Sequence, residues 1–395
     1  MKHILVYRWS NCCETSISNC LNRMGYGVHY LTGIMTDYDH DENMKKAFLS
    51  YFEQCDTEQV VCNAVFSVDY FPIISNICEN KNVIYISWLA DCPMSTMYSK
   101  SIFNKCNRIF AFDKIQYHEL IDMGVSECYH MPLATDITHW ESIQVTSGDI
   151  DKYSSKISFV GTLYNDSTSN QYNSIHTFPD YIRGYFDGVI EAQLNVYGYN
   201  FIEAMLKESI ISETKKNLAL NLGPLYLDVY EKLLANIINM QVSMVERRTV
   251  LNMLGSNYKL DLYTASDTRD ITAPGIDLKG YVDYQTIMPK IFKLSKINLN
   301  ITSKAITSGI PLRVLDIMGA GGFVISNYQP EIAEYFENGI EVVMYESMED
   351  LQLKIAYYLK NNEERERIAM AGYKKVSKLY PYEVKLREIM EIVNQ

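Results

Sequence analysis

A group of polar side chains within residues 307–327 is suited to binding an anion. Arg313 falls in the first turn of an expected helix, where a cation opposes the helix dipole. A bound phosphate would reverse this unfavourable effect, because the guanidinium group can donate two parallel hydrogen bonds to it. Alternatively, Arg313 pairs with Asp316 one turn further along the helix, and the sequence leaves both interpretations open.

The start of the same helix adds backbone donors. Ser308 is expected to be the N-cap and Pro311 to lie in the first turn, where free N–H groups suit a diphosphate. Asp316 either pairs with Arg313 or accepts hydrogen bonds from ribose hydroxyls, since a carboxylate takes two donors at once. The glycines that follow form no G-x-G-x-x-G after a strand, and the chain has no Walker sequence, so a dinucleotide fingerprint is excluded.

Asp91 is the candidate for proton transfer. It follows an expected strand at 83–87, in a turn with Pro93, where an α/β sheet presents functional groups. A carboxylate there can take the proton of a reacting hydroxyl, or it can simply stabilise the turn, and both interpretations stay open. His130 and Asp136 are further candidates, although a lone His beside an apolar run is typical of a structural residue.

The elements that must position these residues alternate between short apolar runs and helical patterns. The expected strands are 3–7, 28–31, 60–67, 83–87, 108–112, 157–160, 259–264, 279–282, 297–301, 323–326 and 342–344. Helical patterns separate them, residues 181–254 are mostly helical, and the polar stretch 140–156 is the expected linker. This alternation predicts two doubly wound parallel sheets, whose ligands bind at the carboxyl ends of the strands.

Composition excludes several classes of protein. A net charge of −12 would repel a phosphate backbone, so nucleic acid is not expected as a partner. No apolar stretch reaches the roughly 18–20 residues of a membrane span, and the run 4–7 is too short for a signal peptide. Nine cysteines show no CxxC spacing, and Cys12 and Cys13 are adjacent, which predicts reduced thiols and a cytoplasmic location.

Several motifs, in this order, resemble one known family. They are the segments 87–93, 110–113, 131–134, 158–164, 280–282 and 295–302, then Pro311-Leu312-Arg313, Asp316 and 319–323, and finally 357–359 and 366–367. Together they resemble the CgeB-type (spore maturation protein) glycosyltransferases of the GT-B superfamily, with a family 1/4-like C-terminal domain. The resemblance covers nearly the whole chain and is weakest over 171–242. Each motif is unspecific alone, and the specificity comes from their order and spacing.

The resemblance implies an α/β protein of the GT-B fold, with two Rossmann-like doubly wound domains facing across a cleft. The acceptor domain would be 1–145, joined by a C-terminal helix at 376–395, and the donor domain 156–375. The implied reaction moves a sugar from a nucleotide-sugar, UDP-sugar favoured, to a protein, peptide or glycan acceptor. No cofactor or metal is implied, because helix dipole and basic residues neutralise the leaving diphosphate. The alternatives are a GT-B-fold nucleotide-sugar epimerase or hydrolase, and a non-catalytic subunit.

Site residues are carried over position by position. In the family, a loop below the diphosphate corresponds to Gly161 and Thr162, and the base lies beside a segment that corresponds to 280–282. Many relatives place two glutamates eight positions apart around the donor helix. Here Ser308 stands at the first position and Asp316 at the second, ribose-binding one, and the missing first acid keeps the non-catalytic alternative open. The expected donor-site residues are therefore Gly161, Thr162, Arg247, Gly280, Tyr281, Val282, Asn300, Ser308, Gly309, Arg313 and Asp316.

Two further patterns have a structural alternative. Asp37, Asp39 and Asp41 form two D-x-D patterns, which hold a divalent metal in GT-A transferases. Here they follow only the second expected strand, so we interpret them as a solvated loop. Arg247 and Arg248 are both cationic candidates for the donor site, with a place on the helix surface favoured for Arg248.

Overall fold

The computed structural model describes residues 2–9, 13–166, 170–172, 175 and 178–394. The chain forms two compact units. Unit 1 consists of Met1–Ala134, Leu222–Asp228 and Leu379–Gln395, and unit 2 of Thr135–Asn221 and Val229–Lys378. The units therefore divide at 134/135 rather than within 145–156, and a short internal segment joins unit 1. Cys12 lies outside the described residues.

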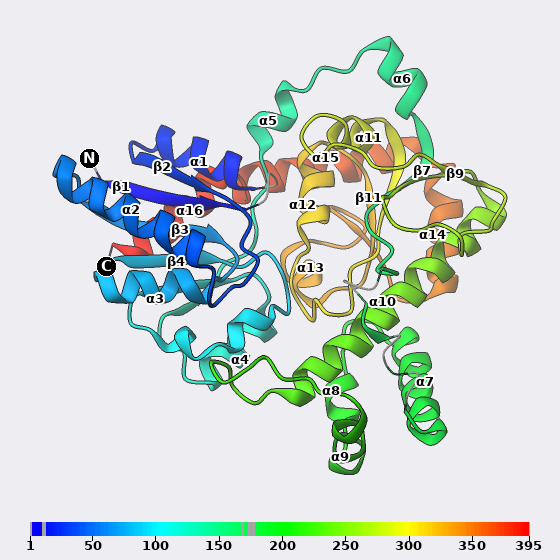
Figure 1. Ribbon diagram of the computed structural model, residues 1–395. Coiled ribbons are helices and arrows are strands. Elements are labelled where there is room, and N and C mark those ends of the chain that lie inside the picture. Colours follow the sequence, from blue (N-terminus) through cyan, green and yellow to red (C-terminus); the bar gives the residue numbers. More distant parts are fainter. Residues whose placement is uncertain (1, 10–12, 167–169, 173–174, 176–177, 395) are drawn as a thin grey trace. The chain divides into compact units, whose positions relative to one another are not determined.

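Unit 1 is built on a six-stranded parallel sheet with strand order β2-β1-β3-β4-β5-β6 (Figure 1). Its strands are β1 His3–Arg8, β2 Gly27–Thr32, β3 Cys62–Val68, β4 Ile84–Trp88, β5 Asn107–Ala111 and β6 Cys128–His130. The central strands are buried on both faces, as parallel strands covered by helices are. The order changes direction between β1 and β3, so the crevice for a ligand is expected at their carboxyl ends.

Helices and short 3-10 turns cover this sheet. They are α1 Glu14–Arg23, α2 Glu42–Glu58, α3 Pro72–Lys81, η1 Ser95–Tyr98, η2 Lys100–Phe103, α4 Lys114–Asp122 and α16 Tyr382–Val393. In the acidic loop before α2, the Asp37 and Asp41 carboxylates accept hydrogen bonds from nearby backbone N–H groups. Asp41 is the N-cap of α2 and accepts the Met44 N–H, and Asp37 accepts the N–H groups of Asp39 and His40.

Unit 1 is completed by two segments from much later in the chain. The segment 222–228 forms an antiparallel bridge between Tyr226 and Ser99, and the Tyr226 hydroxyl donates to Asp39 over 2.7 Å. The helix α16 packs against α1, and the Tyr382 ring meets Trp88 edge-on. Residues more than a hundred positions apart therefore share one core.

Unit 2 holds a second six-stranded parallel sheet with order β12-β11-β10-β7-β8-β9. Its strands are β7 Ser155–Val160, β8 Leu260–Tyr263, β9 Ile276–Leu278, β10 Ser295–Asn300, β11 Val324–Asn327 and β12 Val343–Tyr345. Read in chain order this is 3-2-1-4-5-6, the order of dinucleotide-binding Rossmann folds. The direction of winding reverses between β7 and β10, which places the expected ligand crevice at their carboxyl ends.

The helices of unit 2 include a lobe inserted after β7. The full set is α5 Ile137–Ser142, α6 Ser147–Tyr153, α7 Asp180–Leu194, α8 Ile202–Met205, α9 Glu208–Asn217, α10 Tyr230–Asn257, α11 Met288–Leu294, α12 Leu312–Gly319, α13 Pro330–Tyr335, α14 Met348–Tyr358 and α15 Asn362–Leu379. The helices α7 and α8 pack against α10 and share a separate apolar core with its N-terminal half (Figure 1).

Two expectations about local structure are wrong. The polar stretch 140–156 forms the second half of α5 and all of α6, and it belongs to unit 2 instead of being a linker. Lys290 pairs with Asp149 at 2.9 Å and the Lys293 ammonium donates to the Trp140 carbonyl, so both helices are held against α11. The expected strand at 279–282 is a loop, and β9 ends at Leu278. Gly280, with φ +73°, turns the chain away from the sheet.

Within the part of the chain that the structure describes, no helix is long and apolar enough to cross a membrane. The eight cysteines described there are free thiols.

Candidate functional site

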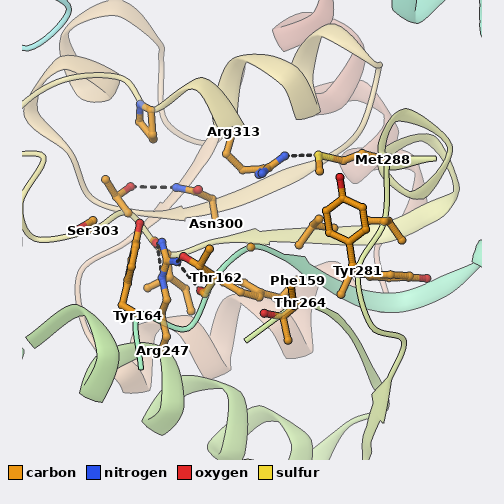
Figure 2. A pocket seen from close by; sticks show the side chains of 18 of the residues that line it. Phe159, Thr162, Tyr164, Arg247, Thr264, Tyr281, Met288, Asn300, Ser303 and Arg313 are labelled. Carbon is orange, nitrogen blue, oxygen red and sulfur yellow. Dashed lines mark hydrogen bonds between the residues drawn. The ribbon is translucent and has the colours of Figure 1, made fainter. Parts of the chain in front are cut away.

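A cavity of about 430 Å³ opens at the carboxyl ends of β7 and β10, where the unit 2 sheet reverses its order (Figure 2). Loops after β7, β8, β9 and β10 line it, together with α10 and the start of α12. Its lining residues are Phe159, Val160, Gly161, Thr162, Tyr164, Arg247, Tyr263, Thr264, Ala265, Tyr281, Val282, Met288, Asn300, Ile301, Thr302, Ser303, Ile306, Pro311 and Arg313. No Asp or Glu is among these described lining residues.

Arg247 reaches the cavity from α10 and is almost completely buried. Its guanidinium group donates to the carbonyls of Thr162, over 2.6 Å, and Ile301, over 2.5 Å. It also lies 4.2 Å from the ring centroid of Tyr164 and 5.5 Å from that of Phe159. These contacts tie the loop after β7 to the end of β10, and none of them neutralises the positive charge.

One face of α10 holds the loop after β10. Ser243, Glu246 and Arg247 are spaced i, i+3 and i+4, which puts their side chains on the same side of the helix. The Ser243 hydroxyl accepts the Lys304 N–H over 2.8 Å, and the Glu246 carboxylate pairs with the Lys304 ammonium at 3.3 Å. Both members of this ion pair are buried. The helix therefore fixes the backbone that lines one wall of the cavity.

Arg313 reaches the cavity from α12 (Figure 2). Its Nη1 contacts the Met288 sulfur, and the guanidinium carbon lies 5.5 Å from the Phe292 ring centroid. No ion pair joins it to any carboxylate within the described residues. Of the two interpretations that the sequence left open, a direct pairing with Asp316 is not formed, although the Arg313 charge opposes the effect of burial, which raises the pKa of Asp316. Most of its N–H donors are therefore available to a ligand.

The start of α12 differs in detail from the prediction. Pro311 is the N-cap, so it precedes the first helical turn, and no side chain caps the helix. Ser308 instead donates its hydroxyl to Glu331 over 2.7 Å, and the Glu331 N–H donates to the Ser308 carbonyl over 3.0 Å. Neither Ser308 nor Gly309 lines the cavity. Glu331 is buried at the start of α13, and the sequence analysis did not single it out.

Asp316 also lies away from the cavity, in a buried network. It accepts the hydroxyls of Thr135, over 2.7 Å, and Tyr284, over 3.0 Å, and the Trp140 indole N–H donates to Thr135 over 2.7 Å. Burial raises the pKa of Asp316 to about 6, against the opposing effects of the Arg313 charge and the two hydroxyls. In this arrangement its carboxylate holds the loop after β9 rather than facing the cavity.

Asn300 and the loop after β9 contribute the remaining predicted residues. The Asn300 amide donates to Thr302 over 3.0 Å and to Ser326 over 2.9 Å at the end of β10. Tyr281 and Val282 line the cavity, with Tyr281 74% exposed, whereas Gly280 supplies the turn before them. A flat exposed ring at this wall is suited to stacking on a ligand ring.

The structure brings seven of the predicted residues to one cavity. They are Gly161, Thr162, Arg247, Tyr281, Val282, Asn300 and Arg313. Arg248 instead lies on the surface of α10 with Asp270 at 3.7 Å. Asp91 belongs to unit 1, in the turn that follows Trp88 at the end of β4, and its backbone N–H donates to Asp69 over 3.0 Å. Asp69 was not predicted, although an acidic residue directly after an apolar strand was a visible signal.

Part of the chain matches a known protein family. Residues 241–391 match the family model described as glycosyl transferase-like. This match covers β8 to β12, the C-terminal half of α10 and most of α16, and it therefore includes Arg247, Asn300 and Arg313. No curated protein matches the chain significantly in sequence.

Solved structures match the whole chain. HepE of Anabaena in complex with UDP-glucose is 10% identical, with a TM-score of 0.57 and full coverage of both chains. A glycosyltransferase from Rickettsia africae is 12% identical at TM-score 0.57, covering 99% of this chain and 97% of its own. Sucrose-phosphate synthase from Thermosynechococcus elongatus is 8% identical at TM-score 0.57, covering 100% and 99%. The chain therefore has the GT-B fold, with two six-stranded parallel sheets and their helices.

Proposed function

We propose that this protein is a glycosyltransferase that takes a sugar from a nucleoside diphosphate sugar, UDP-sugar favoured, and transfers it to a protein, peptide or glycan. The transfer needs no metal ion. Within the GT-B transferases we place it with the CgeB-type enzymes, on the sequence motifs given above. The glycosyl transferase-like match over residues 241–391 supports the class, and the complex of HepE with UDP-glucose supports a uridine donor.

One observation carries the proposal. Arg247 and Arg313 line the same cavity from opposite elements, and neither has a carboxylate partner within the described residues. Arg247 is buried and Arg313 partly buried, and removing such charges from water is unfavourable unless an anion binds there. The backbone N–H groups at the start of α12 are donors for the same anion. A diphosphate at a Rossmann switch point fits this combination of charge and place.

The same cations would serve the reaction. When the bond between the sugar's anomeric carbon and the diphosphate oxygen breaks, the electron pair stays with the diphosphate, whose negative charge grows. Arg313 and the α12 backbone would stabilise that charge in the transition state. The acceptor oxygen bonds to the anomeric carbon, and its proton passes to a carboxylate, for which Asp91 is our candidate.

Titration with UDP, GDP and their sugars tests the proposal, with binding measured by calorimetry and by thermal shift. We expect a uridine ligand to stabilise the wild-type protein. Arg313→Ala should weaken its binding about 10- to 100-fold, because a charge-assisted hydrogen bond contributes about 1.5–3 kcal/mol. A ligand at about 100 times its dissociation constant should stabilise the fold by about 2.7 kcal/mol.

The matched control is Arg248→Ala, which removes an arginine from the exposed side of the same helix that carries Arg247. It should leave ligand binding unchanged. No stabilisation by any nucleotide would contradict the proposal. Binding without transfer or hydrolysis, across a panel of acceptors, would instead support the non-catalytic subunit.

A further inference from the structure

Tyr164 has an unusual backbone conformation in the loop after β7, where it lines the unit 2 cavity. Its φ of +55° lies in the left-handed region, which is rare for residues other than glycine. In the described part of the chain, three other non-glycine residues share this conformation. Gln59 and Asn82 are helix C-caps, where it is ordinary, and Asp69 lies in unit 1. Tyr164 caps no helix, so its conformation needs another explanation.

The residues on either side of Tyr164 are anchored to the loop after β8. The Leu163 N–H donates to the Ser266 hydroxyl over 2.8 Å, and the Leu163 side chain is buried in the core of unit 2. The Asn165 amide donates to the Asp267 carbonyl over 2.6 Å. Backbone strain persists only where surrounding contacts hold it, and it often marks a functional site. These two contacts hold the strained backbone, and the Tyr164 side chain is thereby fixed at the cavity wall.

The Tyr164 ring lies against the guanidinium group of Arg247 (Figure 2). The guanidinium carbon is 4.2 Å from the ring centroid, well inside the range of about 6 Å for a cation–π contact. The Phe159 ring is farther away, with 5.5 Å between the same carbon and its centroid. The Tyr164 hydroxyl makes no hydrogen bond with a described residue, so the contact depends on the ring.

An aromatic ring stabilises a cation without neutralising it. Arg247 is almost completely buried, and its guanidinium group donates only to Thr162 and to the Ile301 carbonyl within the described residues. Burying a cation is unfavourable, and the negative face of an aromatic ring offsets part of this cost. A carboxylate in the place of the ring would compete with an incoming anion. The ring therefore leaves the charge of Arg247 available to a ligand.

Gly161 leaves room beside the same guanidinium group. A Cβ at this position would lie 3.8 Å from Arg247 Nη1 and 3.3 Å from the Phe159 ring. With glycine there, this volume stays unfilled, and both Gly161 and Arg247 line the cavity. An anion can therefore approach Nη1 closely while the Tyr164 ring holds the guanidinium group.

We propose that Tyr164 is a positioning residue for Arg247, whose guanidinium group it holds at the cavity with the charge available to the donor diphosphate. The inference rests on the proposed function, in which this cation binds the diphosphate. Tyr164 acts through the arginine, and its left-handed backbone is the strain that accompanies the placement of the ring.

Tyr164→Leu is the central test, because leucine keeps an apolar side chain but has no aromatic face. UDP affinity, measured by calorimetry, should fall about 5- to 30-fold, because the arginine is no longer held in its binding orientation. Tyr164→Phe keeps the ring and should retain the wild-type affinity. An unchanged affinity in Tyr164→Leu, or an equal loss in Tyr164→Phe, would overturn the proposal.

A double-mutant cycle with Arg247→Met shows whether Tyr164 acts through the arginine. Arg247→Met alone should weaken UDP binding about 10- to 100-fold, because a charge-assisted hydrogen bond is lost. Adding Tyr164→Leu should cause no further loss, since the group that the ring positions is already gone. Two losses that simply multiply would show that Tyr164 acts independently of Arg247, and the proposal would be wrong.

Tyr30→Leu is the matched control. The Tyr30 ring also lies against an arginine, with the Arg8 guanidinium carbon 4.6 Å from its centroid, but both residues belong to unit 1 and neither lines the donor cavity. This variant should bind UDP as the wild type does, and a loss equal to that of Tyr164→Leu would contradict the specific role of Tyr164. Wild-type protein that binds no UDP would instead overturn the proposed function, so the two failures are distinguishable.

Discussion

The carboxyl edges of the two sheets present opposite charges. In unit 2, Arg247 and Arg313 line a cavity that has no acidic residue among its described lining. In unit 1, the ends of β3 and β4 carry Asp69 and Asp91, a carboxyl pair whose protons are held more tightly than usual. The two six-stranded parallel sheets therefore carry different side chains at this edge, and the proposed function assigns anion binding to unit 2 and proton acceptance to unit 1.

Asp91→Asn has the largest expected effect, and it tests whether the carboxyl pair of unit 1 accepts the proton. Loss of a positioned general base typically reduces kcat by about 100- to 10,000-fold. Donor affinity should not change, because the donor cavity lies within unit 2. Steady-state kinetics measures the loss of kcat, and UDP calorimetry measures donor affinity. If the variant loses donor affinity as strongly as it loses kcat, the separate roles of the two units are contradicted.

Glu246→Ala tests whether the buried ion pair with Lys304 stabilises the wall of the unit 2 cavity. Removing the carboxylate leaves the Lys304 ammonium buried without its partner, and breaking such a pair typically destabilises a protein by about 3–5 kcal/mol. Urea unfolding should show this loss. The double variant Glu246→Leu with Lys304→Met should recover most of it, since an apolar pair of similar size needs no solvation. If the double variant is as unstable as the single one, the ion pair is not the cause.

Asp316→Asn has a smaller effect that depends on pH. The pKa of Asp316 in the folded protein is about 6, above its ordinary value, so its contribution to stability is complete below about pH 4 and declines as the pH rises through 6. Wild type should therefore lose up to about 3 kcal/mol relative to the variant between pH 4 and 8. Thermal unfolding across this range measures the difference. Parallel curves for the two proteins would contradict the buried, protonatable state.

Much of the fold was predictable because it depends on local patterns. The apolar runs at 3–7, 60–67 and 297–301 became β1, β3 and β10 with shifts of one or two residues at their ends, since buried parallel strands need nearly continuous apolar sequence. The stretch 140–156 was misread because its helices are polar outside and are stabilised by Lys290 and Lys293, about 140–150 positions away. Contacts between residues so far apart in the sequence cannot be inferred from the local spacing of apolar and polar residues.

The site was predictable to a similar extent. Arg313 was predicted from its place at the start of a helix and Asn300 from the family resemblance, and both line the cavity. The partners of Asp316 did not follow, because Thr135 and Tyr284 approach it from distant segments and neither was among the interpretations that the sequence left open. Asp69 was overlooked because its left-handed backbone is a property of the folded turn rather than of the residue type.

Unit 1 is assembled from three pieces of chain, and this has a consequence for its synthesis. The strands of its sheet are translated before unit 2, yet the segment 222–228 that pairs with Ser99 follows only after α9, and α16 follows all of unit 2. During translation, the face of α1 that α16 covers stays exposed until all of unit 2 has been synthesised. The sheet of unit 1 is thus made before unit 2 but is fully covered only after it, and during that interval the exposed face of α1 is accessible to chaperones.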